Sequence, residues 1–389
     1  MSRSDPPFLP YGRQDITDDD VEAVANVLRS AWLTQGPEIG SFEAALCALT
    51  GAPFAIAVCN ATAALHIACL ACDLGPGDLA WTSPNSFVAS ANCALYCGAD
   101  VDFVDIDPVS LNMSVEALEA KLVRAEAEGR LPKVVIPVHF AGQSCEMAAI
   151  GALAGRYGFR VIEDASHAVG GTIDDVPVGA CAHSDITVFS FHPVKIVTTG
   201  EGGAALTRDP ELANRLELLR SHGITRRDDQ LTQAGPGPWY YEQLVLGFNY
   251  RMTDIQAALG TSQLGRIEGY LQRRHALADL YDAGLEGFAL TRPVRLPGRY
   301  SALHLYVVQL HDPDKRTAVF EALSQANIGV NVHYIPIHLQ PYYRQLGFGP
   351  GDFPKAEDYY ARAITLPLHP RMTDADVERV IASLAEAMG

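Results

Sequence analysis

The stretch Phe54-Ala-Ile-Ala-Val-Cys59, followed by Asn60-Ala-Thr-Ala-Ala-Leu-His66, decides the fold class. Its first half is a short uncharged run without polar alternation, which is typical of a strand buried on both faces. Its second half opens with Asn60, a favoured helix N-cap, and continues in residues that favour a helix. A buried strand that runs directly into a helix is the building unit of a parallel sheet covered by helices.

The same alternation extends along the chain on both sides of this stretch. Strands are expected at 79–82, 101–104, 134–138, 160–163, 186–191 and 204–207, and helices at 18–30, from 87 and at 147–157. A helical stretch at 253–285 leads to a second pattern, with strands at 303–310 and 330–334, a helix at 314–326 and two further helices ending at Met388. We therefore expect an α/β protein. It has a three-layer α/β/α large domain with a mostly parallel sheet at 15–265, then a linking helix and a smaller α+β C-terminal domain at 266–389.

Composition excludes several classes of protein. The 389 residues are 48% hydrophobic and 19% charged, which is globular composition and not that of a disordered chain. The net charge of −17 would repel nucleic acid and anionic membrane surfaces. Two long uncharged runs, at 44–72 and 79–99, contain Pro and Asn and are expected to be buried segments and not membrane spans. Since residues 1–15 hold no apolar signal-peptide core, we expect a cytoplasmic protein.

The cysteines and histidines predict no metal site. Eight cysteines without an export signal favour free thiols over disulfides. The spacing Cys69-x-x-Cys72 with Cys93-x-x-x-Cys97 loosely imitates a zinc ribbon, but both pairs lie inside apolar helical patterns. Buried core cysteines are the simpler interpretation.

Lys195 is the first residue whose surroundings indicate chemistry. It is one of five lysines, and it alone follows a buried-strand pattern, at 186–195, before the turn Gly200-Glu-Gly-Gly203. A lysine in apolar surroundings either extends its amine to solvent or is held for nucleophilic work, because desolvation lowers its pKa. The segment alone leaves both interpretations open.

Asp164 is the second such residue. It ends the expected strand at 160–163, and the carboxyl ends of parallel strands point into the ligand crevice of a sheet. Capping of a following helix is the structural alternative. An acid that holds a pyridine nitrogen protonated and a Schiff-base lysine are together what pyridoxal phosphate requires. Asp164 and Lys195 therefore point to that cofactor.

Residues 60–64 form a candidate phosphate site, because they lie where a buried strand ends and a helix begins. Backbone N–H groups, the helix dipole and the Thr62 hydroxyl can converge there on an anion. Helix capping alone would also explain Asn60 and Thr62. The chain has no G-x-G-x-x-G after its first strand and no G-K-[ST] loop, so a dinucleotide-dependent oxidoreductase or a P-loop protein is poorly supported.

Six segments, in family order and spread over nearly the whole chain, resemble the DegT/StrS-type sugar aminotransferases. They are Trp32-Leu-Thr-Gln-Gly-Pro37, Asn60-Ala-Thr-Ala-Ala-Leu-His66, Glu163-Asp-Ala-Ser-His167, Ser190-Phe-His-Pro-Val-Lys195, Gly200-Glu-Gly-Gly203 and Asn249-Tyr-Arg-Met-Thr-Asp-Ile-Gln256. The resemblance implies a fold type I, pyridoxal-phosphate-dependent transferase that acts on a nucleotide sugar. A catalytically silent ligand-binding protein on the same fold is the rival, and the presence of both Lys195 and Asp164 argues against it.

The resemblance also implies roles for individual residues. Lys195 would bind the cofactor and move the proton, Asp164 would pair with the ring nitrogen, and Phe87 would stack on the ring. His167 would lie near the ring hydroxyl. The phosphate would be held by Thr62, the Ala63 N–H and Ser190, and by Asn249 of a second copy, which makes a homodimer with shared sites.

Within the family, the segments at 190–195 and 238–242 most resemble the transaminase of pseudaminic acid biosynthesis. This implies a UDP-linked 4-keto-6-deoxy-N-acetylhexosamine as substrate, L-glutamate as amino donor and UDP-4-amino-4,6-dideoxy-N-acetyl-β-L-altrosamine as product. A different NDP-4-keto or 3-keto deoxysugar is the alternative. The residues expected to face the sugar nucleotide are Thr34, His333, His338, Arg226 and Arg227, with Arg251 as a further cation. Solvation of a surface loop at 225–238 would equally explain Arg226 and Arg227.

Overall fold

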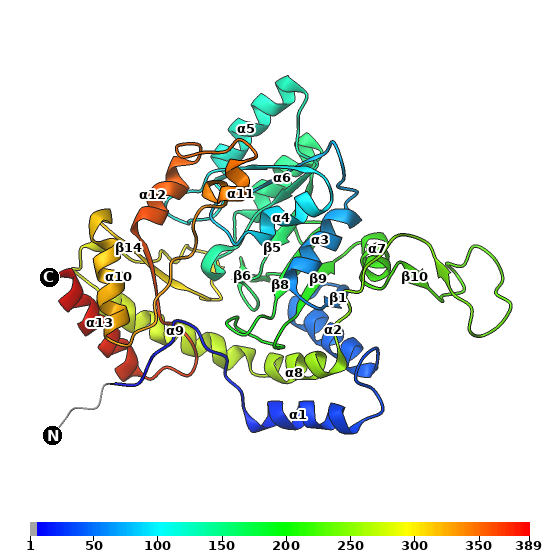
Figure 1. Ribbon diagram of the computed structural model, residues 1–389, viewed down its shortest axis with the longest axis horizontal. Coiled ribbons are helices and arrows are strands. Elements are labelled where there is room, and N and C mark those ends of the chain that lie inside the picture. The colour runs from blue at the N-terminus through cyan, green and yellow to red at the C-terminus, as the bar shows by residue number, and fades with distance from the viewer. Residues whose placement is uncertain (1–5) are drawn as a thin grey trace.

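The computed structural model describes residues 6–389 and contains a central seven-stranded sheet (Figure 1). The strand order is β1-β9-β8-β5-β4-β2-β3. These strands are β1 Phe54–Val58, β2 Leu79–Thr82, β3 Asp100–Phe103, β4 Val134–Ile136, β5 Arg160–Asp164, β8 Ile186–Ser190 and β9 Gly203–Thr207. Only β9 runs antiparallel to its neighbours, β1 and β8. The predicted α/β class with a mostly parallel sheet is confirmed.

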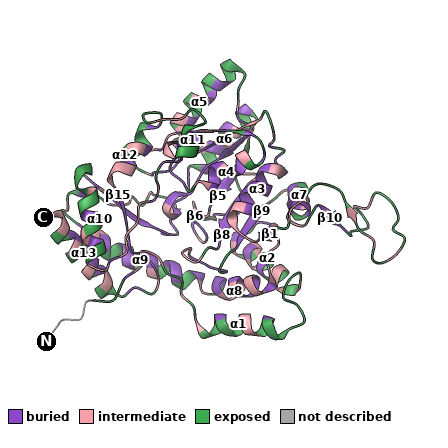
Figure 2. Cartoon of the chain, in the orientation of Figure 1, coloured by how far each residue is buried: buried purple, intermediate pink, exposed green. Residues whose placement is uncertain are grey.

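Helices cover both faces of this sheet, and Figure 2 shows its strands buried between them. The helices of this part are α1 Asp18–Arg29, α2 Pro37–Thr50, α3 Ala61–Ala71, α4 Ala89–Tyr96, α5 Val115–Glu128, α6 Met147–Tyr157, α7 Pro210–Arg220 and α8 Asp254–Leu264. In β1, Ile56 and Val58 pack into one hydrophobic cluster with α3 and α4, whereas Ala55 and Ala57 pack into another with α2. Burial on both faces explains why the strand carries no polar alternation.

The C-terminal part has its own hydrophobic cluster around a three-stranded antiparallel sheet, β12-β14-β15. Its elements are α9 Ile267–Gly284, β12 Leu290–Thr291, β14 Tyr306–Leu310, α10 Arg316–Gln325, α11 Pro341–Arg344, α12 Pro354–Arg362, β15 Ala363–Leu366 and α13 Asp374–Met388. The predicted helical stretch at 253–285 is two helices, α8 and α9, which meet near the expected boundary at residue 265. The two-domain division stays a prediction.

One prediction in this part is wrong, and one strand was missed. The run at 330–334 is not a strand: Asn331 forms an isolated bridge with Thr365, and the chain then turns toward the large domain, where the Ile337 N–H donates to the Pro84 carbonyl. Strand β15, which pairs with β14, was not predicted. The segment at 331–340 therefore lies between the two parts of the molecule and not inside a sheet.

Short strands complete the fold. They are β6 Thr172–Ile173, β7 Val176–Pro177 and β13 Arg299–Tyr300 in one small sheet, and β10 Ile224–Thr225 with β11 Glu242–Gln243 in a hairpin. Residues 226–241 of this hairpin project away from the body of the molecule (Figure 1). Within residues 6–389, no helix combines the length and the apolar content needed to cross a membrane.

Candidate active site

A cavity of about 990 Å³ lies at the carboxyl ends of β5 and β8, beside the N-terminus of α3. It gathers side chains from distant parts of the chain, which is the expected place for a ligand on a parallel sheet. The predicted residues that line it are Thr62, Ala63, Phe87, Asp164, His167, Ser190, Lys195 and His333.

Lys195 lies in the turn that follows β8, where its N–H donates to the His192 carbonyl over 2.8 Å. Burial lowers the pKa of its amine to about 8, although the nearby Asp164 carboxylate acts in the opposite direction. The side chain is half-buried in the cavity wall. An amine with this pKa is available in its neutral, nucleophilic form near neutral pH.

Asp164 is buried, with 4% of its surface exposed. Its Oδ2 accepts a hydrogen bond from Ser90 Oγ over 2.5 Å, and its Oδ1 accepts one from the Ser166 N–H over 3.1 Å. No helix begins after Asp164, which removes the capping alternative. Within residues 6–389 this carboxylate forms no ion pair, although the Lys195 amine is near enough for its pKa to be raised by the carboxylate charge. A protonated pyridine nitrogen would give the carboxylate a direct ionic partner.

The N-terminus of α3 forms one end of the cavity. Asn60 caps the helix, because its Oδ1 accepts the Ala63 N–H over 2.8 Å. The cap therefore occupies the Ala63 amide that we expected to bind phosphate, and the amides of Ala61 and Thr62 have no acceptor within the described residues. Gly203 passes directly beneath: a Cβ there would lie 2.6 Å from the Ala61 nitrogen. Glycine at this position therefore lets β9 pack directly against the start of α3 and fixes where the helix N-terminus lies.

His167 and Tyr334 form an aromatic wall. The His167 Nε2 lies 3.1 Å from the Tyr334 hydroxyl, and the two rings stack with an interplanar angle of 24°. Burial lowers the pKa of His167 well below its ordinary value, so the ring is neutral. The His167 Nδ1 is buried without a partner among the described residues. Phe87 is 59% exposed toward the open cavity, with its ring 6.3 Å from that of Tyr334.

The two histidines that we expected to face the sugar lie in different places. His333 lines the cavity, its Nδ1 lies 2.8 Å from Thr365 Oγ1, and burial lowers its pKa to about 3. His338 does not line the cavity. It is fully buried, because the chain turns after Pro336 and places its Nε2 2.9 Å from Glu357 Oε1.

Five further predicted residues lie outside this cavity, and one of them, Arg251, donates from its Nη1 to Ser221 Oγ over 3.1 Å. Thr34 and Asn249 are exposed and form isolated backbone bridges with Thr253 and Ser221. In the projecting hairpin, Arg227 pairs with Asp229 over 2.9 Å, and the Arg226 guanidinium lies 5.8 Å from the centre of the Tyr241 ring. The chain's own fold does not bring these groups to the cavity.

Sequence reasoning missed several cavity residues, including Tyr11, Ser86, His304 and Tyr334. Tyr334 directly follows His333, which we expected to face the sugar nucleotide, so the histidine could have drawn attention to its neighbour. His66 is buried, with its Nδ1 3.2 Å from the Tyr250 hydroxyl, and it also reaches the cavity.

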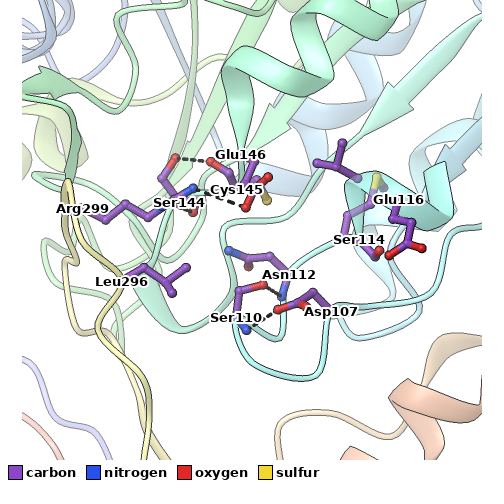
Figure 3. Close-up of a pocket in the computed structure, with 12 residues that line it drawn as sticks. Asp107, Ser110, Asn112, Ser114, Glu116, Ser144, Cys145, Glu146, Leu296 and Arg299 are labelled. Carbon is purple, nitrogen blue, oxygen red and sulfur yellow. Dashed lines mark hydrogen bonds and ion pairs between the residues drawn. The ribbon is translucent and has the colours of Figure 1, made fainter. Parts of the chain in front are cut away.

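A smaller pocket of about 170 Å³ lies beside the N-terminus of α5 (Figure 3). Its polar groups bind one another: Asp107 Oδ1 accepts the Ser110 N–H over 2.6 Å, and Arg299 Nε donates to the Ser144 carbonyl over 3.1 Å. It contains none of the predicted site residues. The pocket is a polar junction and does not extend the cavity.

The larger cavity fits pyridoxal phosphate. The cofactor needs a lysine of lowered pKa, an acid for the ring nitrogen and an anion site in the same cavity. Lys195, the buried carboxylate of Asp164 and the free amides at the start of α3 meet these needs. The Thr62 and Ser190 hydroxyls are the side chains placed to add bonds to the phosphate.

Comparison with known proteins gives a consistent result. Residues 14–385 match the sequence model of the DegT/DnrJ/EryC1/StrS aminotransferase family. The spore coat polysaccharide biosynthesis protein SpsC of Bacillus subtilis is 40% identical over 386 residues, which cover 97% of each chain. The putative sugar aminotransferase Spr1654 of Streptococcus pneumoniae, solved in its PLP form, superposes with a TM-score of 0.89 at 30% identity over 98% of each chain.

A second solved structure is Helicobacter pylori PseC, an aminotransferase involved in the biosynthesis of pseudoaminic acid. It superposes with a TM-score of 0.89 at 31% identity, over 98% of this chain and 99% of that one.

Proposed function

Since the chain belongs to the DegT/DnrJ/EryC1/StrS aminotransferase family, we propose that it transfers an amino group from L-glutamate to C4 of a UDP-linked 4-keto-6-deoxy-N-acetylhexosamine. The chain is a sugar aminotransferase that uses pyridoxal phosphate. The observation that carries the proposal is one cavity that holds an amine of lowered pKa, a buried carboxylate without a hydrogen-bonded cation and a helix N-terminus.

Different residues of the cavity have different roles in transamination. Bound pyridoxal phosphate supplies an electron-accepting ring for the carbon that loses its proton. Asp164 holds the proton on the ring nitrogen, and Phe87 offers an aromatic face on which the ring can stack. The neutral amine of Lys195 takes the proton from the α-carbon of the amino donor and returns a proton at C4 of the sugar. His167 and Tyr334 close one wall of the cavity against water.

Two similarities to other proteins support the proposed identity of the sugar substrate. The segments 190–195 and 238–242 resemble the pseudaminic acid transaminase, and PseC shares the fold over nearly the whole chain. The proposed product is UDP-4-amino-4,6-dideoxy-N-acetyl-β-L-altrosamine. A second candidate is another NDP-4-keto or 3-keto deoxysugar, which is favoured by the 40% identity with SpsC, a protein of polysaccharide biosynthesis.

We infer that two copies of the chain complete each site. A UDP-sugar carries two phosphates, yet within the described residues the cavity wall holds no arginine, and Lys195 is its one lysine. Arg226 and Arg227 lie on a hairpin that projects from the body (Figure 1), together with exposed Trp239 and Tyr241. Packing of this hairpin on a second copy would bury those apolar side chains and bring cations to the substrate. Asn249 would reach the phosphate in the same way. The cytoplasmic location stays a prediction.

Assays with two epimers test the substrate. The purified protein is given L-glutamate and either UDP-2-acetamido-2,6-dideoxy-β-L-arabino-hex-4-ulose or its C5 epimer, the α-D-xylo compound, at matched concentrations. We expect faster amination of the β-L-arabino compound. Amination of the α-D-xylo compound alone would refute the pseudaminic acid assignment and leave the sugar aminotransferase intact.

A further inference from the structure

Two buried serines connect the cavity wall to Asp164. Ser86 lines the cavity, and its Oγ lies 2.6 Å from the Oγ of Ser90, in the first turn of α4. Ser90 Oγ lies 2.5 Å from Asp164 Oδ2. The exposed fractions of Ser86 and Ser90 are 3% and 1%. The distance to Asp164 is at the short end of the range for a hydroxyl that donates to a carboxylate.

The direction of both hydrogen bonds follows from the number of protons. An ionised carboxylate can only accept, so Ser90 must donate its single hydroxyl proton to Asp164. Ser90 can then only accept from Ser86, which must donate to it. The chain of donors therefore runs from Ser86 through Ser90 to Asp164, and a donor that itself accepts a hydrogen bond is polarised and donates more strongly.

Neutral donors have an effect on Asp164 that a cation would not have. They fix the plane of the carboxylate and leave its full negative charge available. An arginine or lysine in the place of Ser90 would neutralise that charge, and the carboxylate would then hold a proton on a ring nitrogen less strongly. Ser166 adds a second neutral donor through its backbone N–H.

We propose that Ser90, supported by Ser86, is a positioning residue that keeps the Asp164 carboxylate aligned, and thereby keeps the proton on the pyridine nitrogen of the cofactor. The alternative is that the two hydroxyls only satisfy one another in the core. The proposal rests on the cofactor of the family and not on the identity of the sugar.

The test is nitrogen-15 NMR of the holoenzyme reconstituted with ring-labelled pyridoxal phosphate, whose nitrogen shift reports protonation. The variants are Ser90→Ala, Ser90→Thr, which keeps the hydroxyl, and Ser86→Ala. Ser83→Ala is the matched control, because Ser83 is equally buried in the same segment but accepts only the Asn85 N–H, over 3.3 Å. Turnover is measured in parallel.

We expect Ser90→Ala to move the nitrogen resonance toward the unprotonated position and to lower kcat by about 10-fold to 100-fold, with KM for the amino donor changed by less than about 2-fold. Ser90→Thr should restore both values, Ser86→Ala should give a smaller shift in the same direction, and Ser83→Ala should give none.

A wild-type resonance in Ser90→Ala would overturn the proposal, whatever its turnover. If Ser90→Ala fails to fold, the nitrogen-15 resonance of Ser86→Ala tests the proposal instead. A partial shift of that resonance supports the proposal, and an unchanged resonance overturns it. Because the resonance is read without substrate, failure of the proposed sugar to react would leave this result interpretable.

Discussion

Replacing Lys195 by alanine should remove multiple turnover, and the structure gives the size of the loss. Within the described residues, no other lysine lines the cavity. Lys121 and Lys133 are held elsewhere, by Asp102 over 2.6 Å and Asp78 over 2.8 Å. No second amine can therefore take over the role of Lys195.

The pKa of Lys195 determines its advantage as a base. At pH 7 an amine of pKa about 8 is neutral in about 9% of molecules, against about 0.03% at the ordinary value of 10.5, a gain of about 300-fold. The buried His333, with its pKa lowered to about 3, is a far weaker base. General base catalysis contributes about 10²-fold to 10⁴-fold, and the variant also loses the covalent link to the cofactor. We expect kcat to fall by at least about 10³-fold.

The assay is steady-state amination of the ketosugar, with Lys355→Ala as the control because Lys355 is exposed. The control should retain turnover within about 2-fold. Added ethylamine should restore part of the activity of Lys195→Ala, and more so at higher pH, where more of the free amine is neutral. If the variant, shown by mass spectrometry to be free of wild-type protein, kept a tenth of normal turnover, the assignment of Lys195 would be refuted.

Three further predictions follow from the same geometry. Asp164→Asn should fold normally, as judged by circular dichroism, but lose at least about 10²-fold in kcat, because an amide cannot hold the ring-nitrogen proton by charge; near-normal kcat would contradict its role. Attachment of pyridoxal phosphate to the apoprotein should accelerate as pH rises through about 8 and then level off, since Lys195 reacts as the neutral amine; a midpoint near the ordinary value of 10.5 would contradict the effect of burial. Gly203→Ala should weaken cofactor affinity, measured by equilibrium titration, by at least about 10-fold, because its Cβ would lie 2.6 Å from the Ala61 nitrogen and displace the helix start; unchanged affinity would show that α3 does not hold the phosphate.

Local signals in the sequence predicted most of the large domain. The predicted helical stretch begins at Thr253, which forms a capping box with Gln256 at the start of α8, and Asn60 caps α3 as expected. Strand β2 and helix α6 have the predicted bounds. Such features depend on residues three or four positions apart, so the sequence alone is sufficient to find them.

The errors lie where distant segments meet. The run at 330–334 has the composition of a strand, but a backbone hydrogen bond from Ile337 to Pro84 draws the following residues onto the large domain. The same turn places Tyr334 on His167 and buries His338 against Glu357. The contact of Ser90 with Asp164 joins residues 74 positions apart. No local pattern of residues encodes these contacts.

The visible spectrum of the holoenzyme, followed through its two half-reactions, shows whether this chain is a transaminase of a ketosugar. L-Glutamate alone should convert the cofactor from its aldehyde form to its amine form and release 2-oxoglutarate in equal amount. The UDP-linked 4-keto-6-deoxy-N-acetylhexosamine should then restore the first spectrum and appear as the 4-amino sugar. If no L-amino acid changed the spectrum, or if no nucleotide ketosugar converted the amine form back to the aldehyde form, this chain would not be a ketosugar transaminase.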